Sequence, residues 1–176
     1  MKSTFANAKG MVTITKWRAV QPLKGLRLRE RWAQWCGIFV PDRFICECQY
    51  TLGENAVVDN SVKQMARLLG GLSQSDRYIN RMQFGTGAAA AADAADTALE
   101  TPISPIKTIS STSYPTDRSV RFQAFLLEDE ANGFPLREAG LLFANTSPLL
   151  ATRKTFEALT KSSDFVFEWN WTIYWA

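Results

Sequence analysis

The last segment of the chain alternates strictly between large apolar side chains and smaller polar ones. Glu168, Asn170 and Thr172 occupy one set of alternate positions. The other set consists of Phe165, Phe167, Trp169, Trp171, Ile173 and Trp175. A period of two places each set on one face of a β-strand. The pattern therefore predicts a C-terminal strand whose ring-bearing face lies on a core or an interface.

Similar alternation recurs along the chain. Residues 120–126 alternate, and strands are predicted at 136–143 and 149–156, with an Asn132-Gly133 turn before them. Earlier strands are predicted at 11–20, 44–52, 78–84 and 106–114. Strands that recur about every dozen residues are typical of an antiparallel sandwich. We expect a mainly β (α+β) fold, an antiparallel β-sandwich with one packed amphipathic helix.

That helix is predicted over residues 57–69. Its expected apolar stripe is Val58, Val62, Met65, Ala66 and Leu69. Asn55 or Asp59 is expected to cap its start, and Gly70 and Gly71 to end it in the left-handed conformation. In the preceding strand the expected inward set is Phe44, Cys46, Cys48 and Tyr50. The alanine-rich stretch after Gly87 is expected to be a packed loop with a helical turn, and Pro102 and Pro105 favour edge structure after it.

Positive charge is concentrated at the start of the chain. The net charge is only +3, too small to indicate nucleic acid by itself, yet Glu30 is the only acid before residue 32. The segment is either a solvated arm or an arm that lies on an acidic partner. We expect residues 1–50 to form an extended, partner-docking basic arm and 51–176 to form the β domain. The expected docking residues are Lys16, Arg18, Lys24, Arg27, Arg29 and Arg31.

The cysteines do not predict a disulfide framework or a metal site. Cys36, Cys46 and Cys48 are odd in number, so they cannot all pair within one chain, and the sequence contains no histidine. Reduced thiols are the expectation, with bonds between subunits left open, and no cofactor or metal is expected. No apolar run of about 18 residues predicts a membrane span.

Sequence patterns for catalysis are weak. Nucleophile–histidine chemistry is excluded by the absence of histidine, and Pro105 works against a Ser104–Lys107 dyad. The Gly85 to Gly87 segment lacks the further residues of a phosphate-binding loop, which favours a structural turn. The acids at 128–130 are expected to form a solvated hairpin tip, with a divalent cation as the alternative. We therefore expect a protein that is not an enzyme.

Two further groups of residues are expected to be structural. Glu138 lies in an apolar strand and must be paired if buried, so we expect it to tie a loop to the sheet, and Gly140 to allow a close backbone approach. The large rings are candidate anchors in a core or an interface, and stacking on single-stranded bases is a less favoured interpretation. The interface candidates are Trp17, Trp32, Trp35, Trp169, Trp171 and Trp175.

From about Asn55 to the end, the order of segments resembles that of bacteriophage tail-fibre, tail-collar and baseplate-associated proteins. The matching segments are 55–58, 84–87, the alanine-rich loop to 98–99, 120–122, 132–133, 137–141, 149–153 and 160–164. The resemblance covers about two thirds of the chain, and residues 1 to about 50 lie outside it. It implies a virion component, commonly oligomeric and often trimeric, with no catalytic residues to transfer.

The resemblance, together with the weakness of the catalytic patterns, implies a structural protein of a phage tail that acts by subunit assembly and fibre anchoring. Its expected partners are other tail proteins, namely fibre, baseplate or tail-tube and collar subunits, and further copies of itself. It would be made in the host cytoplasm and reside in the virion tail. The alternatives are a receptor- or carbohydrate-binding module of a fibre and a hydrolase of the cell envelope.

Overall fold

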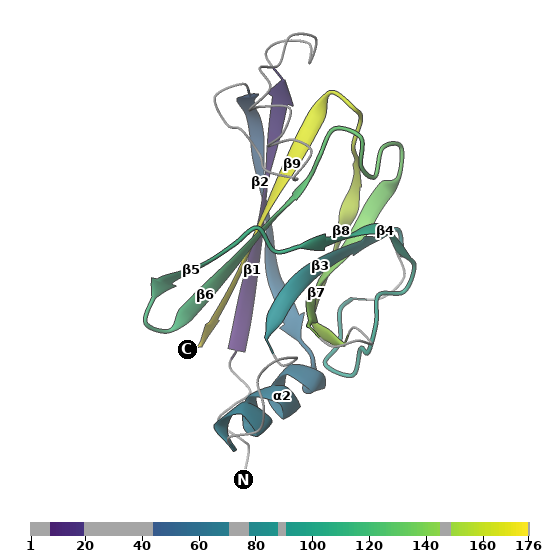
Figure 1. The fold of residues 1–176 in the computed structure, drawn as a ribbon. Coiled ribbons are helices and arrows are strands. Elements are labelled where there is room, and N and C mark those ends of the chain that lie inside the picture. Colours follow the sequence, from purple (N-terminus) through teal and green to yellow (C-terminus); the bar gives the residue numbers. More distant parts are fainter. Residues whose placement is uncertain (1–7, 20–43, 71–77, 88–90, 145–148, 176) are drawn as a thin grey trace.

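A computed structural model describes residues 8–19, 44–70, 78–87, 91–144 and 149–175. The described residues form nine strands and one helix (Figure 1). The elements are β1 (Ala8–Ala19), β2 (Phe44–Val57), α2 (Asp59–Leu69), β3 (Ile79–Gly85), β4 (Pro102–Thr108), β5 (Ser111–Thr116), β6 (Ser119–Leu126), β7 (Pro135–Phe143), β8 (Leu150–Thr160) and β9 (Phe165–Trp175).

The strands form one antiparallel sheet that curls, in the order β4-β3-β7-β8-β2-β1-β9-β6-β5. The sheet has two halves, β4-β3-β7-β8 and β1-β9-β6-β5, and β2 joins them. β2 pairs with β1 along its length and with β8 only at Ala56 and Val57. The connection between the two edge strands crosses between the halves, since Ile109 N–H donates to Asn80 O and Ser110 N–H to Gln123 O. The mainly β, antiparallel fold with a packed helix is confirmed, whereas two separate sandwich layers remain a prediction.

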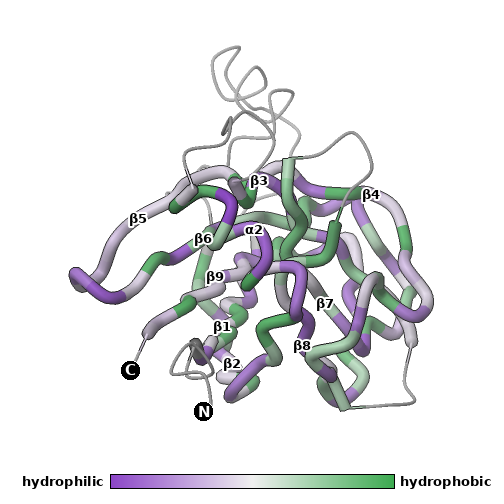
Figure 2. Tube along the Cα trace, turned by 90° about the horizontal axis from the view of Figure 1, so that it is seen from below, coloured by the Kyte–Doolittle hydropathy of each residue, from purple (hydrophilic) through white to green (hydrophobic). Residues whose placement is uncertain are grey.

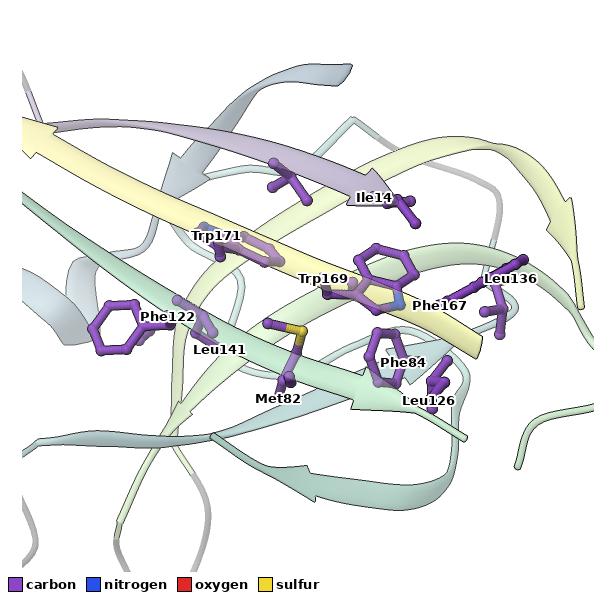
Figure 3. Close-up of a cluster of buried hydrophobic side chains, with 14 of the residues drawn as sticks. Ile14, Met82, Phe84, Phe122, Leu126, Leu136, Leu141, Phe167, Trp169 and Trp171 are labelled. Carbon is purple, nitrogen blue, oxygen red and sulfur yellow. The ribbon is translucent and has the colours of Figure 1, made fainter. Parts of the chain in front are cut away.

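The core lies between the two halves of the curled sheet (Figure 3). Phe167, Trp169 and Trp171 of β9 are fully buried, which confirms the C-terminal strand and its hidden ring-bearing face. The Trp169 ring lies 4.8 Å from the ring of Phe84 in β3, centroid to centroid. Burial of such large rings supplies much of the favourable free energy of folding.

The first described strand is part of the sheet, not of an arm. β1 lies between β2 and β9, with Ile14 opposite Tyr50 on one side and Trp169 on the other. Its β-branched residues Val12 and Ile14 are fully buried, which explains why this segment prefers the sheet to solvent. The arm prediction is therefore wrong for residues 8–19, and the expected boundary at residue 50 falls inside β2. Lys24, Arg27, Arg29, Arg31, Trp32, Trp35 and Cys36 lie outside the described residues.

The helix is present, but its buried side matches the predicted stripe only in part, since Val58 is fully buried and Met65 is half-buried. α2 buries Ser61 and Gln64, while Val62 and Leu69 are exposed. The reason is a polar contact with β8, in which Ser61 Oγ donates to Ala151 O over 2.6 Å. The N-cap is Val58 and uses no side-chain bond, so neither predicted cap acts there.

Two local predictions near α2 are also wrong. Gly70 ends the helix with φ of −76°, which is not left-handed, and Gly71 lies outside the described residues. In β2, Cys46 and Tyr50 are exposed instead of inward, and Cys48 is half-buried. This end of β2 pairs with β1 alone among the described strands, so no facing strand covers it.

The remaining connections follow the prediction more closely. Residues 91–101 form a loop with one turn at Ala94 and Ala95. The proline-containing segment becomes β4, an edge strand as expected. The single strand expected over 106–114 is instead divided between β4 and β5. In the described part of the chain, no helix has both the length and the apolarity needed to cross a membrane.

Candidate functional site

An apolar groove of about 550 Å³ lies between α2 and one end of the curled sheet. α2 contributes Met65 and Leu68 to its lining, and the sheet contributes residues of β3, β5, β6, β7 and β9. Figure 2 looks onto this end and shows α2 over the space between the two halves. The groove exists because α2 packs on β8 through its small polar side and leaves apolar side chains facing the sheet.

Exposed rings and aliphatic side chains surround the groove. Tyr114 of β5 is 77% exposed and Trp175 at the end of β9 is 38% exposed, and both line the groove. On α2 itself, Val62 and the 82% exposed Leu69 form what we call the α2 ridge. Exposed apolar surface next to an apolar groove is typical of a protein docking site.

A buried ionic cluster lies at a second place in the fold, where β7 and β8 meet the 91–101 loop. Glu138 of β7 has no exposed surface and accepts hydrogen bonds from Glu100 N–H at 3.1 Å and Thr101 N–H at 2.8 Å. Arg153 of β8 donates from Nε to Glu138 over 3.0 Å and from Nη1 to Asp96 over 3.0 Å. The carboxylate thus links the loop to the sheet through two backbone amides and one guanidinium.

The charge state of this cluster follows from its contacts. Burial alone would lower the pKa of Arg153, but hydrogen bonds and the negative charges of Asp96 and Glu138 raise it above its usual value. The guanidinium therefore stays charged, and its fork matches two carboxylates at once. The contacts of Glu138 and Arg153 join β7, β8 and the 91–101 loop of the same chain, which is the arrangement of a structural link.

The nearby glycines make room for the cluster. A Cβ on Gly85 would lie 2.4 Å from Glu138 Oε1, and one on Gly87 would lie 2.7 Å from the same atom. A Cβ on Gly140 would lie 2.9 Å from the backbone oxygen of Thr152. Gly85, Gly87 and Gly140 therefore have a packing role next to Glu138 and the β7–β8 ladder.

The acidic segment between β6 and β7 is not the solvated tip that its composition suggests. Glu128 is buried, and Glu130 forms an ion pair with Lys107 while accepting the Leu127 N–H. The Asn132-Gly133 turn is present, with Gly133 at φ of +78°, which glycine adopts without strain. The segment contacts the end of β8 through the backbone of Glu128 and the side chain of Asn132, while Asp129 stays exposed.

Lys161, at the end of β8, is the centre of that contact. It is only 1% exposed and donates to Asn132 Oδ1 over 2.9 Å, Glu128 O over 3.1 Å and Ser162 O over 3.4 Å. Burial lowers the pKa of Lys161 to about 8, while the negative charges of Glu128, Glu130 and Asp129 act in the opposite direction. Sequence reasoning missed this residue, because a lysine before two serines is ordinary turn composition.

The described basic residues of the expected arm have acidic neighbours in β2. Lys16 Nζ lies 2.6 Å from Glu47 Oε2, and Arg18 also pairs with Glu47. The hydrogen bond from Lys16 is the main reason why the pKa of Glu47 lies below its usual value. Lys16 also lies over the Phe165 ring, 3.6 Å from its centroid. Part of the positive charge is therefore compensated within the chain.

The expected tryptophan anchors fall into different environments. Trp169 and Trp171 are fully buried, so they belong to the core and are wrong as interface candidates. Trp17 is partly buried and donates from its indole nitrogen to Glu168 over 2.7 Å. Trp175 alone among the described candidates lines the groove.

Neither the comparisons with known proteins nor the positions of potential metal ligands assign a function to the described residues. Cys46 and Cys48 are free thiols, and no group of three or more potential metal ligands lies together in the described ranges. The chain matched no family model, no curated protein and no solved structure.

Proposed function

We propose that this chain is a structural component of a bacteriophage tail, at a collar, baseplate or fibre attachment, and that it acts by subunit association without catalysis. Two observations support the proposal. The order of segments from Asn55 onward resembles that of such proteins, and the groove below α2 gives the described domain an apolar surface suited to another chain. The groove is the observation that carries the argument. The two halves of the curled sheet would serve as the layers of a sandwich that presents this groove.

The partner that we assign to the groove is a second copy of the chain. The groove and the α2 ridge are a concave and a convex apolar surface on one molecule, and the same helix contributes to both. A contact between two different patches of identical chains is head-to-tail, and it forms a ring when its rotation closes. A trimeric ring fits the symmetry that the resemblance implies.

Replacing Leu69 with glutamate tests this contact. A charge in place of the most exposed apolar side chain of the ridge costs little in the monomer but would have to be buried unpaired in the groove of the next copy. We expect the parent chain to be oligomeric by light scattering after gel filtration at micromolar concentration. The Leu69→Glu and Tyr114→Glu variants should shift to monomers while their circular dichroism and melting temperature stay near those of the parent.

The matched control is Ile45→Glu, a similar change at an exposed apolar residue of β2, which does not line the groove. It should leave the oligomer intact. A monomeric parent chain, or equal dissociation by all three variants, would contradict the assignment of the groove to a second copy.

The tail location needs a separate test. Particles purified from the phage or prophage that encodes the chain should contain it, and antibody labelling in electron micrographs should fall on the tail. Labelling of the head alone, or absence of the protein from intact particles, would refute the proposed location whatever the oligomeric state.

A carbohydrate-binding function is the second candidate, and it rests on the exposed rings of Tyr114, Trp175 and Tyr78 at the groove. Such rings stack on sugars, but sugar binding also needs several fixed polar groups. The lining has few of them, with Asp117 and Ser119 among these few. Specific signals for the purified protein on a glycan array, lost in a Tyr114→Ala variant, would favour this candidate.

A further inference from the structure

Lys161 and Asn132 are held side by side by their backbones. They form a bridge just beyond the end of the β7–β8 ladder, whose last pair is Pro135 and Thr160. Gly133 N–H donates to Lys161 O over 2.9 Å and fixes the same register. The two side chains meet with Lys161 Nζ at 2.9 Å from Asn132 Oδ1.

The carboxamide of Asn132 is held from both ends. Its Oδ1 accepts from Lys161, and its Nδ2 donates to Glu128 O over 2.6 Å. Lys161 is 1% exposed, so bulk water is largely excluded from the amine. A buried nucleophile that is held in contact with a carbonyl group reacts as if at very high concentration.

We propose that Lys161 and Asn132 join in an intramolecular isopeptide bond. The neutral amine attacks Cγ of Asn132, the Nζ–Cγ bond forms and the Cγ–Nδ2 bond breaks. One proton moves from the amine to the departing nitrogen, so the products are a secondary amide and one molecule of ammonia. The reaction needs no oxidant, reductant or cofactor.

The surrounding groups suit this reaction. Because the pKa of Lys161 is about 8, the amine and ammonium forms are comparable in amount near that pH. The charged groups around Lys161 are the carboxylates of Glu128, Glu130 and Asp129, with Lys107 paired to Glu130. We assign proton transfer to Glu128, because it is buried and its backbone oxygen accepts from both Lys161 and Asn132, which places this residue beside the pair. Glu130 is instead occupied by Lys107 and the Leu127 N–H.

A competing reaction has the same leaving group. In an Asn-Gly sequence the glycine nitrogen can attack the same Cγ and form a cyclic imide. Here Gly133 N–H is directed at Lys161 O, away from the Asn132 side chain. Because both reactions release ammonia, the intact mass cannot distinguish them, and the test must identify the nitrogen that is joined.

Tryptic peptide mapping of the purified full chain makes that distinction. The isopeptide bond removes the cleavage site at Lys161, so peptide 122–137 should be found joined to peptide 155–176, lighter by one ammonia than their sum. The joined peptide should persist in mild base, which opens a cyclic imide. Recovery of separate peptides that end at Lys161 and at Arg137, after incubation at pH 8 to 9, would overturn the proposal and leave Lys161 as a hydrogen-bonded clamp.

Variants separate the roles of the residues. Lys161→Met and Asn132→Ala should each abolish the joined peptide, and Asn132→Asp should restore it with loss of water instead of ammonia. Glu128→Gln should slow the reaction at least tenfold while the fold is kept, which circular dichroism would verify. If Lys161→Met does not fold, Glu128→Gln and Asn132→Asp still decide the outcome.

The dependence of the rate on pH is a further check. In freshly refolded protein the rate should rise about tenfold per pH unit below pH 8 and level off above it, because it follows the neutral amine. A rate that keeps rising with pH, unchanged in Lys161→Arg, would indicate imide formation by Gly133 and contradict the proposal.

Discussion

Replacing Arg153 with methionine is expected to lower the free energy of unfolding by about 3–5 kcal/mol. Glu138 has no exposed surface, and Arg153 is the only cation that pairs with it among the described residues. Methionine preserves much of the packing volume but leaves a buried carboxylate with two backbone amides as its remaining donors. The 91–101 loop should loosen as well, because Asp96 loses the same partner.

Urea unfolding followed by tryptophan fluorescence would measure the loss. Arg121→Met is the matched control, since Arg121 is exposed and its side chain donates to Thr172. This variant should lower the free energy of unfolding by no more than about 0.5 kcal/mol. The double variant Arg153→Met/Glu138→Leu should recover part of the stability, because no buried charge remains. An Arg153→Met protein as stable as the Arg121→Met control would show that the cluster is not a stabilising link.

Replacing Trp169 with alanine is expected to cost about 3–5 kcal/mol. The ring is fully buried between β9 and the facing half of the sheet, 4.8 Å from Phe84 and 5.6 Å from Phe156 between ring centroids. Its removal leaves a cavity in the core. Both halves of the sheet enclose that cavity, so the surrounding side chains cannot readily collapse into it. Thermal or urea unfolding would give the value.

Two variants calibrate this result. Trp169→Phe should cost much less, because the buried indole nitrogen has no hydrogen-bond partner among the described residues and phenylalanine keeps most of the ring. Trp175→Ala changes the same residue type on the same face of β9, but at an exposed position, and should affect stability less than Trp169→Ala. Equal losses at the two tryptophans would contradict the core described here.

The elements that could be predicted from the sequence are strands in which apolar and polar residues alternate, because this alternation indicates that one face is buried. β6 and β9 are such strands, since residues such as Phe122 and Trp169 face the core at every second position. α2 was predicted as a helix, but its buried side was predicted only in part, because helical spacing identifies an apolar face without showing whether a neighbour covers it. Here a serine contact with β8 decides the packing, and Leu69 stays exposed.

The candidate sites were harder to predict because they depend on pairing over long distances in the chain. Glu138 could be singled out as a carboxylate in an apolar strand, but its partners could not, because the Glu100 and Thr101 amides are 38 and 37 residues away and Arg153 is 15 residues away. Asn132 and Lys161, 29 residues apart, are brought together only by the β7–β8 ladder. The groove depends on the position of α2 relative to the sheet, and no local sequence pattern indicates that position.

The pairing of β1 with β9 has a consequence for how the protein is made. The first and last described strands are neighbours in the middle of the sheet, and the ring-bearing face of β9 completes the core. While the ribosome is still synthesising the chain, β1 and β6 each lack this neighbour, and their apolar faces have no cover. The domain therefore closes only after β9 has emerged from the exit tunnel, which makes folding slow and dependent on protection of the nascent chain from aggregation.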